Sequence, residues 1–205
     1  SDHAYRIGRF LGWYYSDGGK KKVRAVIGKD TRRSSYMFEY AIVAGLTASG
    51  ADAYMLHVTT TPSVSYAVAG DDFDCGVMIS ASHNPFSDNG IKLVNRRGEK
   101  IDDETIAAIE DYLDGKVPEV PFATGENLGQ IVDYAAGRNR YIGYLISLSR
   151  YSFKPFRIGL DCANGASWMI ARSVFEALGA QVSVINASPD GLNINRGAGS
   201  THIEG

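Results

Sequence analysis

Short apolar segments alternate with longer segments of helical periodicity along the first 115 residues. The apolar segments predict buried strands at residues 23–30, 51–58, 75–80 and 90–95. The segments between them predict helices from residue 34 or 35 to about 50, after Pro62, and over 102–115. Apolar strands separated by helices are typical of a mostly parallel or mixed sheet with helices on both faces. The sequence therefore predicts an α/β fold.

The spacing of side chains adds detail for two of the expected helices. In the helix that begins near residue 34, the small or apolar side chains Met37, Ala41, Ala44 and Ala48 share one face. Residues 4–14 also have helical spacing, without the charged-then-apolar layout of a signal peptide. We expect this first segment to be a surface helix.

The composition changes after residue 115, where Pro, Gly and polar residues predict a long connection to about residue 130. A helix follows at 138–151, with Ile142, Leu145 and Ile146 directed inward. A new unit then starts with a strand at 157–162, a helix at 167–179 and a strand at 180–185. So few strands cannot bury their apolar faces alone. We expect one nearly complete domain over residues 1–151 and a truncated second α/β domain of the same type over 152–205.

Composition excludes several classes of protein. The net charge of the 205 residues is -2 and no basic patch is evident, which argues against a nucleic-acid partner. The apolar stretches are far shorter than the roughly 18 residues that a membrane span needs. Cys75 and Cys162 lie in apolar surroundings without CxxC spacing, and we expect two buried, reduced thiols. These features favour a globular protein of the cytoplasm.

The stretch VMISASHNPFSDNGIK, residues 77–92, places reactive side chains directly after a buried strand. Ligands of open parallel sheets bind beyond the carboxyl ends of the strands, which is where Ser82 lies. His83 and Asn84 add hydrogen-bonding groups, and Pro85 restricts the loop. Lys92 follows a tight DNG turn that would fold the next strand back and return its ammonium group toward Ser82.

A second loop, KDTRRSS at residues 29–35, leaves the first strand at the same edge and brings Lys29, Arg32 and Arg33 there. The planar guanidinium group suits phosphate because it bonds two oxygens at once. Taken singly, these residues also fit ordinary roles, since a loop serine is usually a cap or turn residue. The sequence has no G-x-S-x-G elbow, so Ser82 and His83 do not indicate a hydrolase.

These segments resemble a known superfamily. SASHNP and DNGIK are similar to the phosphoserine loop of the α-D-phosphohexomutases, and GKDTRRSS is similar to their preceding arginine loop. Together with SPDGLNINRGAGSTH, at 188–202, they most resemble the bacterial members that act on hexosamine phosphates. The similarity extends over nearly the whole chain.

The resemblance implies a phosphotransferase that interconverts glucosamine 6-phosphate and glucosamine 1-phosphate through a 1,6-bisphosphate. Ser82 would carry the phosphoryl group, and that phosphate would be one ligand of a Mg²⁺ ion. Arg32, His83 and Lys92 would help to neutralise the charge of the transfer. Arg32, Asn84 and Lys92 would bind substrate or phosphate, and Lys92 could also move a proton.

Two motifs of the superfamily are missing from the sequence: the FGTxGxRG type before Ser1 and the DGDGDR type whose aspartates hold the metal. We therefore expect an N-terminal fragment that does not turn over alone. A phosphomannomutase or phosphoglucomutase is the alternative enzyme, because the sugar-selecting loop lies outside the chain. A sugar-phosphate-binding module without turnover is the alternative of another class. A homodimer is also left open.

Overall fold

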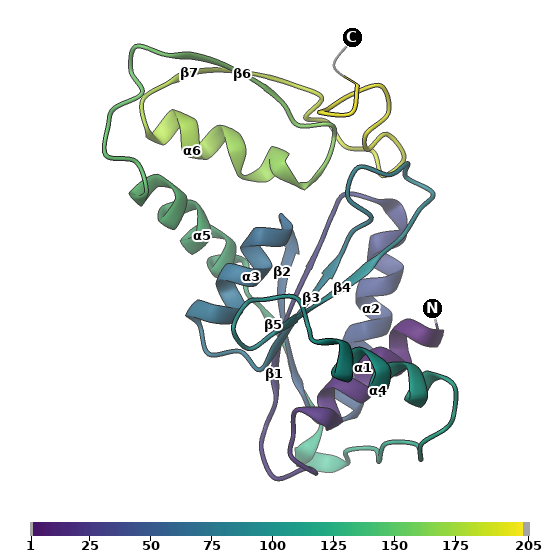
Figure 1. Cartoon of the computed structure of the whole chain (residues 1–205). Coiled ribbons are helices and arrows are strands. Elements are labelled where there is room, and N and C mark those ends of the chain that lie inside the picture. Colours follow the sequence, from purple (N-terminus) through teal and green to yellow (C-terminus); the bar gives the residue numbers. More distant parts are fainter. Residues whose placement is uncertain (1, 203–205) are drawn as a thin grey trace.

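The computed structural model describes residues 2–202. Its main sheet has five strands in the order β4-β3-β1-β2-β5 (Figure 1). They are β1 Arg24–Lys29, β2 Asp52–Val58, β3 Cys75–Ile79, β4 Ile91–Asn95 and β5 Ile131–Asp133. Four strands run parallel, while β4 is antiparallel to β3. This confirms the predicted mixed sheet, although the short strand β5 was not predicted.

Helices cover both faces of this sheet. Figure 1 shows α1, α2 and α4 on one side and α3 and α5 on the other. Their bounds are α1 Asp2–Tyr14, α2 Arg33–Ala48, α3 Thr61–Gly70, α4 Asp103–Leu113 and α5 Ala135–Ser147. Successive residues of β1 alternate between two apolar clusters, with Ala25 and Ile27 under α1, α2 and α4, and Val26 under α3. The predicted two-sided α/β architecture is therefore present.

The first two helices contact each other more closely than the sequence suggested. A Cβ atom on Gly8 would lie 2.2 Å from the Ile42 carbonyl oxygen, and one on Gly45 would lie 2.1 Å from the Tyr5 carbonyl oxygen. The glycines therefore let the two backbones touch. Because α1 packs against α2 there, α1 is largely buried, with Leu11 1% exposed, rather than a surface helix.

The predicted face of α2 is not its buried face. Met37 is 50% exposed and Ala44 is exposed. The buried residues of the helix are Ser35, Glu39, Ile42, Val43, Gly45 and Leu46. The larger β-branched and leucine side chains pack on the sheet and α1, where they remove more apolar area from water than alanines would.

The remaining described residues, 152–202, form what we call the second unit. Its strands β6 Arg157–Asp161 and β7 Gln181–Ile185 pair in parallel. The predicted helix at 167–179 divides into a 3₁₀ turn, η2 Ala166–Met169, and a short helix, α6 Ala171–Ala177. Another 3₁₀ turn, η1 Gly125–Asn127, lies in the long connection. Residues of β6 and β7 alternate between exposed and half-buried, as expected for a sheet with one covered face.

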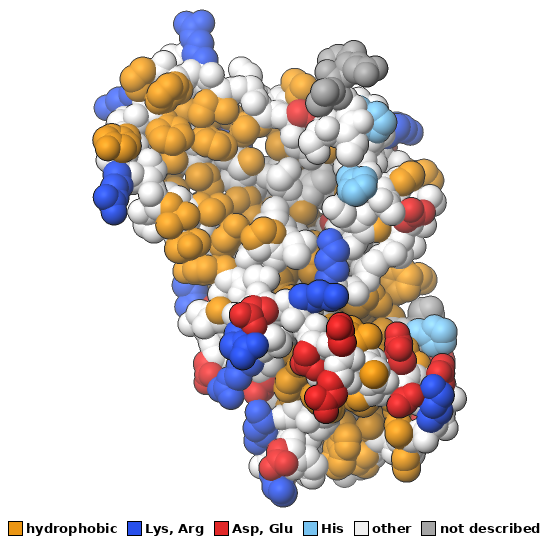
Figure 2. All heavy atoms as spheres, viewed as in Figure 1, with side chains coloured by type: hydrophobic (Ala, Val, Ile, Leu, Met, Phe, Trp, Pro, Cys, Tyr) orange, Lys and Arg blue, Asp and Glu red, His pale blue; other side chains and the backbone are white. Residues whose placement is uncertain are grey.

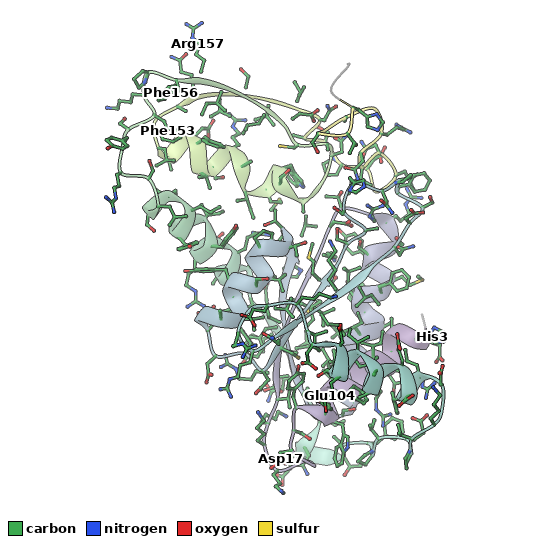
Figure 3. All side chains as sticks on the ribbon, viewed as in Figure 1. His3, Asp17, Glu104, Phe153, Phe156 and Arg157 are labelled. Atoms are coloured by element: carbon green, nitrogen blue, oxygen red, sulfur yellow. The ribbon has the colours of Figure 1, made fainter. Side chains whose placement is uncertain are left out.

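An apolar groove of about 670 Å³ opens between α5 and α6. Figure 2 shows the apolar side chains gathered over this part of the molecule. In Figure 3, Phe153 and Phe156 lie just before β6, while Arg157 projects away from the molecule. The predicted inward residues Ile142, Leu145 and Ile146 of α5 do pack here, against Tyr141, Ile170 and Val174. The apolar packing between α5 and the second unit is therefore small and partly open.

The two thiols are free and buried, as predicted. Burial raises the pKa of the Cys75 thiol to about 12. Among the described residues, no helix combines the length and apolar character that crossing a bilayer would take.

The contact between α1 and α2 gives a stability test. Gly45→Ala forces a methyl group against the Tyr5 carbonyl, and we expect it to lower the free energy of unfolding by about 2–3 kcal/mol, as overpacking does. Gly143→Ala in α5 meets nothing within 4 Å and is the matched control. It should raise stability by up to about 1 kcal/mol through helix propensity. Urea unfolding of both variants measures the difference, and equal stabilities would contradict the proposed close packing.

Candidate active site

Ser82 lies in the connection between β3 and β4, which we call the serine loop (residues 80–90). Its base is closed by a hydrogen bond from the Ser80 N–H to the Gly90 carbonyl oxygen (2.9 Å). The Ser82 N–H donates to Ser80 Oγ (3.1 Å). Ser82 has φ +55°, which costs energy for a residue with a side chain and must be imposed by its surroundings. Its side chain is exposed at the carboxyl edge of the sheet.

Arg32 is the side chain that holds this loop. Its terminal nitrogens donate to four loop carbonyl oxygens: those of Ser82 (3.0 Å) and Asn84 (3.0 Å) from Nη2, and those of Asp88 (3.2 Å) and Pro85 from Nη1. The side chain is 1% exposed. Four charge-assisted hydrogen bonds from one planar group fix the carbonyls in a single arrangement.

Asp30 completes the arrangement around the guanidinium group. Its Oδ2 accepts from Arg32 Nε (2.8 Å), and the carboxylate is also buried. Its Oδ1 accepts from the Arg32 N–H (3.0 Å) and from Ser35 Oγ (2.8 Å). Asp30 therefore neutralises the buried charge and fixes the start of α2 at the same time.

All five N–H groups of the Arg32 guanidinium are engaged by protein acceptors. The side chain does reach the serine loop, as expected from the sequence. It binds the back of the loop, however, and has no N–H to offer a phosphate without breaking one of these bonds. This geometry favours a positioning role for Arg32 over the direct phosphate contact that we expected.

The other residues of the motif differ in whether their side chains make hydrogen bonds to the protein. Asn84 Nδ2 donates to Asp88 Oδ2 (3.0 Å), so its amide stabilises the loop. His83 is exposed. Over residues 2–202, neither the imidazole of His83 nor the hydroxyl of Ser82 makes a hydrogen bond to the protein. Both groups are therefore available to a ligand.

Lys92 lies in β4, two residues beyond the end of the serine loop, opposite Met78. It shares a sheet face with Val94, which packs under α3, and its side chain is exposed. The antiparallel course of β4 is confirmed and leaves Lys92 near the carboxyl end of β3. The tight turn predicted at DNG is absent, because the turns of the loop lie at residues 81–84 and 85–88, closed by hydrogen bonds from the Asn84 and Asp88 N–H groups. Within the part of the chain that the structure describes, the Lys92 ammonium group has no ion-pair partner.

Two other cations expected at this edge have different surroundings. Lys29 is 2% exposed and pairs with the buried Glu39, and its ammonium lies 3.5 Å from the centre of the Tyr36 ring. It is held inside the fold and cannot reach a ligand. Arg33 is exposed at the first residue of α2.

The second unit also contacts the serine loop, through a residue that the sequence did not single out. Asn195 Nδ2 donates to the carbonyl oxygens of Ser82 (2.9 Å) and Asn84 (3.0 Å). It lies in the segment that resembled the superfamily, but a contact across more than a hundred residues carries no local signal in the sequence.

The described residues do not form a metal site of their own. Between residues 2 and 202, His, Cys, Asp and Glu side chains do not gather in any group of three or more that could hold an ion. Mg²⁺ needs several oxygen ligands, and a phosphate on Ser82 would supply only part of that set. The donors present are therefore insufficient for the expected Mg²⁺ without ligands from elsewhere.

The role of Arg32 can be tested by substitution. Arg32→Lys keeps a charge beside Asp30 but supplies at most three donors, so it must abandon several loop carbonyls. We expect a loss of about 2–4 kcal/mol in unfolding free energy. The exposed neighbour offers a control, since Arg33→Lys should stay within about 0.5 kcal/mol of the parent chain. Chemical denaturation measures both, and an unchanged Arg32→Lys variant would show that the hydrogen bonds to the loop are dispensable.

Comparison with known proteins places this geometry in a family. The profile described as phosphoglucomutase/phosphomannomutase, alpha/beta/alpha domain I, matches residues 1–118. A protein named phosphoglucosamine mutase from Lachnospira eligens is 67% identical over 100% of this chain and 46% of its own length. One of the same name from Lachnoclostridium phytofermentans is 64% identical over 99% of the chain and 45% of its length. The chain thus spans less than half the length of these relatives.

Solved structures have the same fold. A phosphoglucomutase/phosphomannomutase family protein from Burkholderia thailandensis aligns with a TM-score of 0.74 at 24% identity, covering 92% of this chain and 40% of that one. A putative phosphomannomutase from Thermus thermophilus aligns with a TM-score of 0.72 at 25% identity, covering 93% and 43%. Because the domain I profile accounts for more than half of the residues, the chain belongs to the phosphoglucomutase/phosphomannomutase family.

Proposed function

We propose that this chain is the phosphoserine-bearing part of an enzyme that interconverts glucosamine 6-phosphate and glucosamine 1-phosphate. The observation that carries the proposal is the exposed Ser82 hydroxyl, held at φ +55° on a loop that Arg32 fixes from behind. The choice of a hexosamine rests on the two relatives named phosphoglucosamine mutase. The work of the whole enzyme would fit the synthesis of cell-wall precursors.

In the proposed reaction, Ser82 begins as a phosphoserine. A hydroxyl oxygen of the sugar monophosphate attacks the phosphorus, the bond from phosphorus to Ser82 Oγ breaks, and the proton of the attacking hydroxyl ends on the serine oxygen. The bisphosphate then returns its other phosphoryl group to Ser82, so that enzyme and phosphate count are restored. Such a transfer depends mostly on positioning and on neutralising charge.

Each of the candidate site residues has a role in the proposed reaction. The His83 imidazole would donate to a phosphate oxygen beside Ser82, and the exposed ammonium of Lys92 would bind phosphate and carry the proton. Asn84 and Arg32 would act by holding the loop. A bound Mg²⁺ would offset the negative charge of the moving phosphoryl group, with the Ser82 phosphate as one ligand and the others from beyond these residues.

The organisation of the protein is part of the same proposal. Residues 1–151 would form the phosphoserine domain, and 152–205 would be part of a second α/β domain of a longer protein, since the chain spans 46% and 45% of the two relatives. We propose a cytoplasmic enzyme. A homodimer is compatible with this proposal.

The alternative substrates have their own support. The family is named for phosphoglucomutase and phosphomannomutase, and a structural neighbour is a putative phosphomannomutase. A panel of hexose and hexosamine phosphates, assayed with the complete protein, separates these enzymes from one another. Binding of sugar phosphates without turnover of any of them would favour the non-catalytic binding module.

The proposal makes a direct prediction for Ser82. In the complete protein, Ser82→Ala should lower kcat by about 10³-fold or more, because the group that accepts and donates phosphate is gone. Ser87→Ala removes another exposed hydroxyl of the same loop and should leave kcat nearly unchanged. Peptide mass spectrometry should locate a phosphate on Ser82.

The 205-residue chain assayed alongside should not turn over, since it supplies only one of the expected metal ligands. Near-normal activity of Ser82→Ala would refute the proposed role of this serine. A turnover rate of the chain alone within tenfold of that of the complete protein would refute the proposal that catalysis needs residues outside this chain.

A further inference from the structure

Asn195 is the one side chain of the second unit, among the described residues, that donates a hydrogen bond to the serine loop. Its amide nitrogen reaches the carbonyl oxygens of Ser82 and Asn84. Arg32 Nη2 donates to these same two oxygens, so each carbonyl accepts two hydrogen bonds. A carbonyl has two lone pairs, and both are therefore used at the two residues that flank His83.

The backbone conformation of Asn195 suits this contact. Its φ is +58°, a left-handed conformation that asparagine tolerates better than most residues. The side chain is only partly buried, so apolar packing does not account for its position. The hydrogen bonds to the serine loop account for it.

Neighbouring contacts join the same two parts of the chain. The Gly191 carbonyl accepts from the Arg33 N–H (3.0 Å), and Thr31 Oγ1 donates to the Asn164 carbonyl oxygen (2.6 Å). Figure 1 shows the segment after β7 beside the serine loop and the start of α2. At the serine loop the contact between the two units is polar and made of few bonds, while α5 and α6 join the units elsewhere through apolar side chains. Polar contacts of few bonds are typical of parts of a protein that can shift relative to each other.

We propose that Asn195 is a positioning residue that makes the geometry of Ser82 depend on the docking of the second unit. The inference rests on the proposed function of Ser82. When the second unit is docked, Arg32 and Asn195 both donate to the carbonyl oxygens of Ser82 and Asn84. When it moves away, the loop keeps Arg32 and loses the two bonds from Asn195. Phosphoryl transfer, which depends on orientation, is thereby coupled to the arrangement of the two units.

Hydrogen exchange measured by mass spectrometry on this chain is the first test. Asn195→Ala should speed exchange in the peptide that covers residues 80–91 severalfold and leave α1 and α4 unchanged. Asn195→Asp keeps the shape but turns a carboxylate oxygen toward two carbonyls, and it should do the same. Asn186→Ala is the matched control, because Asn186 also lies in the second unit at positive φ (+49°) but donates to Asp161 instead. Exchange of the loop at the parent rate in both Asn195 variants would overturn the inference.

Kinetics of the complete protein give the second test. Asn195→Ala should lower kcat by up to about 100-fold with little change in KM, since the loop is misplaced while the substrate contacts remain. Asn186→Ala should keep both constants, and an unchanged kcat in Asn195→Ala would contradict a positioning role. The exchange test needs no turnover. If Ser82→Ala proved fully active, the proposed function would fail, while the exchange result would still decide whether Asn195 holds the loop.

Discussion

The buried pair of Arg32 and Asp30 is the interaction on which the candidate site depends. The positive charge of Arg32 is neutralised by the carboxylate of Asp30. The terminal N–H groups of Arg32 donate to the carbonyl oxygens of the serine loop. Removing either partner would leave a buried charge without compensation, which is costly. The same pair fixes the start of α2, so the first helix after β1 and the loop after β3 are held as one structure. The strained backbone of Ser82 can persist because this surrounding network determines it.

The arrangement separates two tasks at the carboxyl edge of the sheet. Arg32 and Asn195 bind backbone carbonyls of the serine loop and set its position. The side chains of His83 and Lys92 are exposed, and within residues 2–202 neither is held by a hydrogen bond or ion pair to the protein. An anion bound there would meet side chains that need not first give up protein partners, which lowers the cost of reorganisation. Lys29, by contrast, is a cation of the core, paired with Glu39 beneath Tyr36.

Much of the fold could be predicted from the sequence because its signals are local. Strands β1 to β4 are short apolar runs, and the reversal of the chain between β3 and β4 was also expected. The position of Ser82 followed from the rule that ligands bind beyond the carboxyl ends of parallel strands. What failed depends on tertiary contacts. The buried face of α2 is set by its packing on α1 and the sheet, and the terminal nitrogens of Arg32 are engaged by loop carbonyls that lie 50 to 56 residues away in the sequence. The contact of Asn195 spans a still longer separation and has no periodic pattern to reveal it.

The most direct measurement is a crystal structure of the complete protein with Ser82 phosphorylated. The Arg32 guanidinium should remain about 3 Å from the carbonyl oxygens of Ser82, Asn84, Pro85 and Asp88. The phosphate should extend from Ser82 Oγ toward His83 and Lys92. An Arg32 that has left those carbonyls to bind the phosphate would contradict the account, because it would make Arg32 a ligand-binding group and leave the conformation of the loop without its main support.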